Sequence, residues 1–217
     1  SGELDNGMTV SVSFEMDQGT ANNSSLGFDN HSVSVSSDTM GTLTLAGHGG
    51  SSATSAIDTT AAGDMWDNFD GLTVLGGTTL AAAAVGNGGV DNSFFYKSPD
   101  LMDGLNVTFS YNPQTATEKG ESGYGVNFTG MEGLSLSYAF SDEETQAGTD
   151  TSGDNTVISA SYAYGPVTVS YSDMENAVAA NANAADREST SYAVSYTVSD
   201  ELSLTYGSET HDQGSTS

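Results

Sequence analysis

The stretch MTVSVSFEMD, residues 8–17, decides the fold class of this chain. Every second residue from Met8 to Met16 is apolar, and the residues between them are threonine, serine and glutamate. This period of two predicts a β-strand with one apolar face. The alternation recurs in nine further segments: 33–35, 43–45, 105–111, 124–128, 134–140, 158–164, 167–171, 192–198 and 202–206. With residues 94–97, the pattern predicts about eleven strands, and helical periodicity is nearly absent.

The connections between these segments alternate strictly between short and long. The short ones are turns at 39–41, 99–104, 130–133, 165–166 and 199–201. The long ones are polar links at 18–30, 48–92, 112–122, 142–155 and 173–190. An antiparallel meander with all turns at one end and all loops at the other gives this alternation, and transmembrane β-barrels have that layout.

The composition excludes several classes of function. The chain has 217 residues, with 29 acidic side chains against 3 lysines and arginines, and a formal net charge of −26. So few bases cannot neutralise a phosphate backbone, which excludes nucleic acid as a partner. The chain has no cysteine, so it has no disulfides and no thiolate metal site. Only 36% of the residues are apolar, which is low for a conventional buried core.

The apolar faces of the strands favour contact with lipid. Their aromatic residues lie near strand ends, while the middles are mostly valine and leucine. These aromatic residues are Phe14, Tyr111, Tyr124, Phe128, Phe140, Tyr164, Tyr171, Tyr192 and Tyr206. Aromatic rings at both ends of an apolar band form an interfacial girdle. The pattern therefore predicts an all-β, transmembrane antiparallel β-barrel, with residues 1–217 as a single domain. The second interpretation is a secreted or cell-surface acidic β-rich structural or adhesive protein, whose aspartates would bind Ca²⁺.

Three short stretches carry a resemblance to a known family. Residues 94–111 read FFYKSPDLMDGLNVTFSY, a strand, a short turn and a second strand. Residues 2–10 read GELDNGMTV, and residues 41–48 read GTLTLAGH. These stretches resemble the Gram-negative general porins, and the layout is most similar to the alphaproteobacterial ones.

The resemblance has consequences for the longest link, residues 48–92. In porins, a constriction loop that folds into the barrel follows the fifth strand. The resemblance thus implies that link 48–92 folds inward. It also implies that the eleven strands are strands three to thirteen of a sixteen-stranded barrel, so that this chain is a partial barrel.

The resemblance also implies a location and a function. It implies a passive diffusion channel for small hydrophilic solutes and ions in a bacterial outer membrane, in contact with the lipid bilayer and assembled as a homotrimer. The expected pore-constriction residues are Asp58, Asp64, Asp67 and Asp70 on the loop, and His48, Lys97, Glu15 and Asp17 on the wall. An acid-lined pore attracts cations, so cation preference is expected.

The acidic cluster at residues 64–70 has two other interpretations. Asp64, Asp67 and Asp70 are spaced three residues apart and would share one face of a helical turn. They could form a solvated loop face, or they could bind a Ca²⁺ ion, although their spacing is not that of an EF-hand loop. No other cofactor is expected.

The sequence gives little support to an enzyme. The histidines, His31, His48 and His211, lie on separate links, and there is neither a nucleophile elbow nor a glycine loop that opens a helix. Most acids fall on long loops and on positions expected to face the lumen. Such a surplus of carboxylates suggests a marine or halophilic habitat, since salt screens their repulsion.

Overall fold

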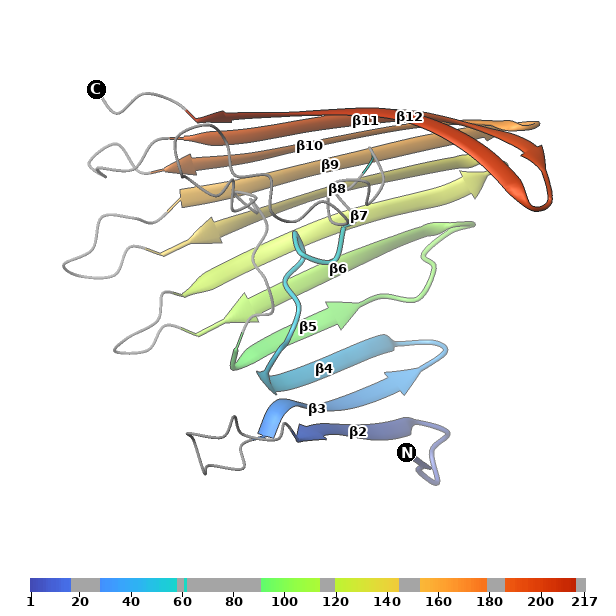
Figure 1. The fold of residues 1–217 in the computed structure, drawn as a ribbon. Helices are drawn as coiled ribbons and strands as arrows, with labels where there is room; N and C mark the ends of the chain where they lie inside the picture. Colours follow the sequence, from blue (N-terminus) through green and yellow to red (C-terminus); the bar gives the residue numbers. More distant parts are fainter. Residues whose placement is uncertain are drawn as a thin grey trace.

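The structure, a computed structural model, describes residues 1–16, 28–57, 61, 91–113, 120–144, 153–178 and 186–213. These residues form one antiparallel sheet of twelve strands in chain order (Figure 1). The strands are β1 (Gly2–Glu3), β2 (Thr9–Met16), β3 (Phe28–Ser37), β4 (Gly41–His48), β5 (Ser93–Lys97), β6 (Leu105–Asn112), β7 (Glu121–Met131), β8 (Leu134–Glu143), β9 (Gly153–Tyr164), β10 (Val167–Val178), β11 (Arg187–Ser199) and β12 (Leu202–Gln213). The described residues contain no helix with the length and apolar character that a membrane span requires. The predicted all-β antiparallel class is confirmed.

Each strand pairs with the next one along the chain, so the sheet is a meander. The short turns lie together at one end of the sheet (Figure 1), and the strand ends that the longer connections join lie at the other. The turn before β6 needs a glycine. Gly104 has a φ of +68°, and a Cβ there would lie 2.6 Å from the Gly130 Cα. The strand limits confirm the predicted alternation of short and long connections.

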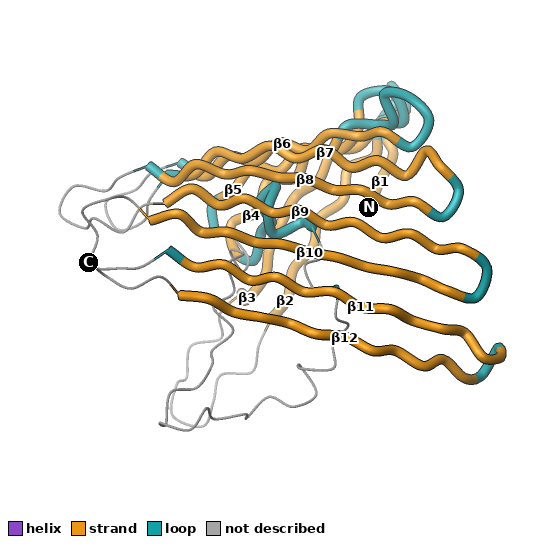
Figure 2. Tube along the Cα trace, turned by 90° about the horizontal axis from the view of Figure 1, so that it is seen from above, coloured by secondary structure: helices purple, strands orange, loops and turns teal. Residues whose placement is uncertain are grey.

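The sheet is strongly curved, and Figure 2 shows it as a trough seen from above. β1 and β12 are its two edges in the described part of the chain. The segment 49–57, which follows β4, lies on the concave side (Figure 2). The described sheet is thus a curved, open wall, consistent with the predicted partial barrel.

The two faces of the sheet differ in chemistry. Large apolar side chains on the convex face stay exposed, as with Tyr124 at 52% and Tyr164 at 76%. The buried apolar side chains of the described residues are few: Ala46, Ala53, Ile57, Ala139, Val157, Met174 and Ala193. Burying apolar area stabilises a protein by about 25 cal/mol per Å². A convex band that forgoes this stabilisation in water indicates a face that meets lipid.

Aromatic side chains lie side by side near the loop end of the convex face. The ring centroids of Phe109 and Tyr124 are 6.3 Å apart, and those of Tyr124 and Phe140 are 6.2 Å apart. Phe94 and Tyr111 form a second pair nearer the loop end, with ring centroids 6.4 Å apart. Amphipathic and aromatic rings at this level are typical of a membrane interface.

The strands are more numerous and longer than the alternation predicted. The extra strand is β1, where the sequence predicted only a turn, and it pairs Gly2 with Val10. The predicted link 173–190 was too long, because β10 continues to Val178 and β11 begins at Arg187. The apolar pattern stops at the edge of the lipid band, whereas the ladder of backbone hydrogen bonds continues beyond it.

Five acids have outward parity at the loop ends of β8 to β11, in residues that were predicted to belong to long links. Asp142, Asp154, Asp173, Glu175 and Glu188 have outward parity, and each lies nearer the loop end of its strand than the outward aromatic residues of that strand. Asp173 accepts hydrogen bonds from the Tyr171 hydroxyl at 3.3 Å and the Thr190 hydroxyl at 2.9 Å. Beyond the apolar band the outward positions are wet, so carboxylates cost little there.

Candidate functional site

The concave face is a wall of hydroxyl and amide side chains. The inward positions of β6 to β11 are mostly serine, threonine and asparagine, and several of them are buried. The buried ones are Thr108, Ser110, Ser141, Asn155, Ser172, Ser189 and Ser191. The period of two that places apolar residues outward places these residues inward.

These inward side chains bond to one another across the strands. Asn176 donates to Asn155 at 2.7 Å, and Asn155 donates to Ser141 at 3.3 Å. The Ser172 and Ser191 hydroxyls lie 3.1 Å apart. Cross-strand hydrogen bonds satisfy polar groups that would otherwise be costly to bury. The result is a hydrophilic wall that carries little charge of its own.

The chain that follows β4 is in direct contact with this wall. The backbone N–H of Ala53 donates to the Ser110 hydroxyl of β6 at 2.9 Å. The N–H of Ala61 donates to the Ser172 hydroxyl of β10 at 3.4 Å. Ala53 is fully buried. The first part of link 48–92 therefore lies against the inner face, and its role as a constriction stays a prediction.

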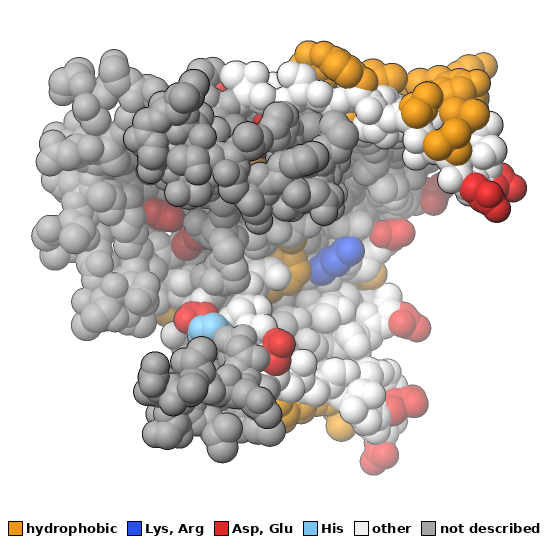
Figure 3. Space-filling view, in the orientation of Figure 1, with side chains coloured by type: hydrophobic (Ala, Val, Ile, Leu, Met, Phe, Trp, Pro, Cys, Tyr) orange, Lys and Arg blue, Asp and Glu red, His pale blue; other side chains and the backbone are white. Residues whose placement is uncertain are grey.

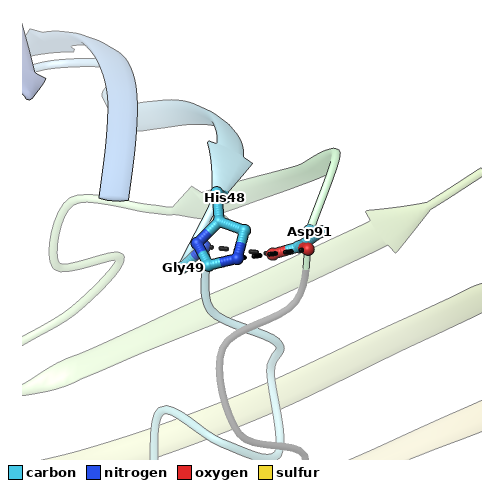
Figure 4. Close-up of polar contacts among 3 residues, drawn as sticks. All are labelled: His48, Gly49 and Asp91. Carbon is cyan, nitrogen blue, oxygen red and sulfur yellow. Dashed lines mark hydrogen bonds and ion pairs between the residues drawn. The ribbon is translucent and has the colours of Figure 1, made fainter. Parts of the chain in front are cut away.

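The two ends of this link meet in a polar cluster (Figure 4). His48 Nε2 lies 3.6 Å from Asp91 Oδ2, and both side chains are 47% exposed. Asp91 Oδ1 accepts a hydrogen bond from the Gly49 N–H at 3.2 Å. The Asn92 N–H donates to the Gly47 carbonyl at 3.2 Å, which closes the base of the link.

Three of the predicted constriction residues are on described strands. Glu15 has inward parity on β2 and accepts a hydrogen bond from Asn30 at 2.7 Å. His48 contacts Asp91, as described above. Lys97 is exposed and shares an inward row with Thr42 and Thr108. Within the described part of the chain, no carboxylate lies within ion-pair distance of Lys97.

The other predicted site residues lie outside the described residues. These are Asp17, Asp58, Asp64, Asp67 and Asp70. The two interpretations of the acidic cluster at residues 64–70, a solvated loop face or a Ca²⁺ site, therefore both stay predictions. Where the structure does describe the chain, no group of three or more histidine, aspartate and glutamate side chains could hold a metal ion.

Two inward-facing acids escaped the sequence interpretation. Glu121 and Glu143 are directly opposite each other on β7 and β8, at the loop end of the wall, and Glu121 is only 7% exposed. The predicted links 112–122 and 142–155 included both residues. Continuing the alternation of faces past Tyr124 and Phe140 would have placed both glutamates on the inward face.

Comparisons with known proteins agree with this architecture. A family model described as Gram-negative porin matches residues 1–217. The structure is similar to an anion-selective porin from Comamonas acidovorans, with a TM-score of 0.67 and 18% identity, over 98% of this chain and 66% of that one. It is also similar to a mutant porin of Rh. blastica, with a TM-score of 0.50 and 15% identity, over 98% of this chain and 85% of that one. No curated protein sequence matches the chain.

An apolar band outside and a hydrogen-bonded polar face inside are the two faces of a transmembrane β-barrel wall. The chain belongs to the Gram-negative porin family, and its place is the bacterial outer membrane. The family resemblance inferred from the three short stretches is confirmed. The chain spans 66% of the length of the Comamonas porin.

Proposed function

We propose that this chain forms most of the wall of a water-filled outer-membrane channel through which small hydrophilic solutes and ions diffuse. The observation that carries the proposal is the contrast between the two faces of one sheet. The convex face exposes its apolar side chains, and the concave face presents mutually bonded hydroxyls and amides. Lipid on one side and water on the other account for both faces.

The channel prefers cations in this proposal, because its charge is overwhelmingly negative. The formal net charge is −26. Glu15, Glu121 and Glu143 have inward parity at the loop end, whereas Lys97 is the one base whose side chain the structure describes. Acidic side chains at the entrance of a channel raise the local concentration of cations there. The Comamonas porin is described as anion-selective, but at 18% identity the likeness supports the fold alone.

Acids also mark the turn end of the wall, where Figure 3 shows red side chains along the rim. They belong to the short turns and the residues that flank them: Glu3, Asp5, Asp38, Asp100, Asp103, Glu132, Asp200 and Glu201. Fixed charge at exposed rims is screened within about 10 Å at 0.1 M salt. The cation preference should therefore be large at low salt and small at high salt, a behaviour suited to a saline habitat.

The full-length protein in a planar bilayer under a salt gradient tests both parts of the proposal. A reversal potential that favours cations supports the selectivity, and one that favours anions refutes it. Folded protein that inserts but gives no conductance refutes the channel itself. The homotrimer rests on the family resemblance, and chemical cross-linking of the protein in detergent, read as the mass of the largest product, tests it.

The alternative, a secreted acidic β-rich protein, has no observation in its favour. The match of the whole chain to the Gram-negative porin family also speaks against it. Its apolar strand faces would need to pack against a second sheet, whereas those of this chain stay exposed.

A further inference from the structure

One row of the concave wall is apolar, unlike the rows on either side. Gly125, Ala139, Val157 and Met174 are consecutive cross-strand partners on β7, β8, β9 and β10. Ala139 and Val157 are fully buried, and Met174 is 7% exposed. On a wall that faces water, an apolar row needs a cover, since leaving it wet forgoes the stabilisation of burial.

The chain after β4 supplies that cover. Ala53 and Ile57 form one buried apolar cluster with Ala139, Val157 and Met174. Ala53 is completely buried and Ile57 is 7% exposed. The apolar row is therefore occupied by a segment of this same chain.

A glycine on the neighbouring row brings this segment close to the wall. A Cβ at Gly123 would lie 3.3 Å from the Ala53 Cβ and 2.7 Å from the Ser110 Oγ. The Ser110 Oγ is also the acceptor for the Ala53 N–H, at 2.9 Å. A larger residue at Gly123 would therefore press on the contact and on its hydrogen bond.

We propose that Gly123, Ala139, Val157 and Met174 form a seat that fixes segment 52–57 at one place on the wall and so sets the width of the channel. Gly123 and Val157 act as positioning residues. The inference rests on the proposed channel function, but it concerns what holds the segment rather than which ions pass.

The chemistry of the seat has a consequence for salt dependence. The contacts are apolar, apart from hydrogen bonds from the Ala53 and Ala61 N–H groups to neutral hydroxyls. Salt screens charges and does not weaken apolar burial. The position of the segment should thus be the same at low and high salt, even where the selectivity changes.

A pair of introduced cysteines tests the seat directly, because the chain has no cysteine of its own. Disulfides need a Cβ–Cβ distance of about 3.5–4.5 Å. The pair Ala53→Cys with Gly123→Cys starts from 3.3 Å, so a small shift and a rotation of the Ser110 hydroxyl suffice. We expect this pair to cross-link on mild oxidation of the full-length folded protein, at low and high salt alike. The control pair, Ala53→Cys with Ser135→Cys, should not, because Ser135 lies six residues along β8 from Ser141, the cross-strand partner of Gly123.

A matched pair of charge substitutions tests the role of the apolar row. Val157→Asp puts a carboxylate into the seat, whereas Ser159→Asp puts one on the same face of β9, two residues away. Combined with the Ala53–Gly123 cysteine pair, Val157→Asp should abolish cross-linking and raise the conductance, while Ser159→Asp should leave cross-linking intact. Equal effects of the two substitutions would overturn the seat.

The outcomes separate this inference from the channel function. A folded protein whose Ala53–Gly123 pair stays reduced overturns the seat, whatever its conductance. Cross-linked protein without conductance supports the seat and overturns the channel. If Val157→Asp does not fold, the cysteine pair alone decides.

Discussion

Lys97 offers the sharpest test of the electrostatics of this channel. It has inward parity on β5, it is exposed, and the described residues place no carboxylate within ion-pair distance. Figure 3 shows basic atoms inside the hollow of the concave side. Because no described side chain neutralises this ammonium, its full charge is expected to act on passing ions. Lys97→Gln should therefore increase the preference for cations.

The magnitude follows from Coulomb's law with water as the medium, since the side chain is exposed. An ion that passes about 8 Å from the ammonium interacts with it by about 0.5 kcal/mol before screening, and by about 0.2 kcal/mol at 0.1 M salt. The sign is opposite for cations and anions, so removing the charge changes their difference by about 0.5 kcal/mol. The ratio of cation to anion permeability should rise about twofold for Lys97→Gln and about fivefold for Lys97→Glu.

Reversal potentials in planar bilayers measure this ratio, with Lys97→Arg as the charge-preserving control. In 1 M salt the Debye length falls to about 3 Å, and the effect of Lys97→Gln should nearly vanish. A ratio that does not change at 0.1 M salt would show that Lys97 is remote from the ion path. A change that persists undiminished at 1 M salt would refute the reasoning from an exposed, screened charge.

Three further predictions concern the turn glycine, the base of the link and the acidic cluster. Gly104→Ala should prevent correct folding or greatly lower stability in urea titrations, because the added Cβ would collide with the backbone of β7. The control, Gly7→Ala, has a φ of +78° but open space around the added Cβ, and it should lower stability by only about 1–2 kcal/mol. Asp91→Asn should lower the free energy of unfolding by less than about 1 kcal/mol, because the contact with His48 that it weakens is half exposed, and because the amide oxygen can still accept from the Gly49 N–H. A larger loss would show that the charge of Asp91 holds the link. Replacing the three aspartates of the acidic cluster at residues 64–70 with asparagine should weaken cation preference and abolish any Ca²⁺ binding in calorimetric titration; unchanged selectivity would assign them to a solvated loop face.

Local patterning was sufficient to predict the strands and their environment. The alternation in residues 8–17 and in the segments from 105 to 206 marks strands with one apolar face, and the spacing of the turns marks a meander. Both signals depend only on neighbours along the chain. The limits of the strands were less predictable, because β10 and β11 continue past the apolar band with outward Asp173, Glu175 and Glu188.

The candidate site was less accessible, because its geometry depends on contacts between distant residues. The sequence placed Glu15 and Lys97 on the inward parity and singled out link 48–92. It gave no sign that Ala53 would bond to Ser110, which lies 57 residues further along the chain. The alternation also gave no role to Val157, which lies just before the predicted strand 158–164.

The order of residues along each strand was enough to say which side chains point outward and which inward, because a strand alternates its faces whatever it packs against. The sequence also sets the charge, and with it the proposed preference for cations. The position of the segment after β4, in contrast, depends on the folded sheet. Curvature of the sheet brings β6, β8 and β9 around one segment, so the apolar row through Val157 becomes a surface that Ala53 and Ile57 can cover. That contact exists only when the strands stand in their mutual register, and no local pattern encodes it.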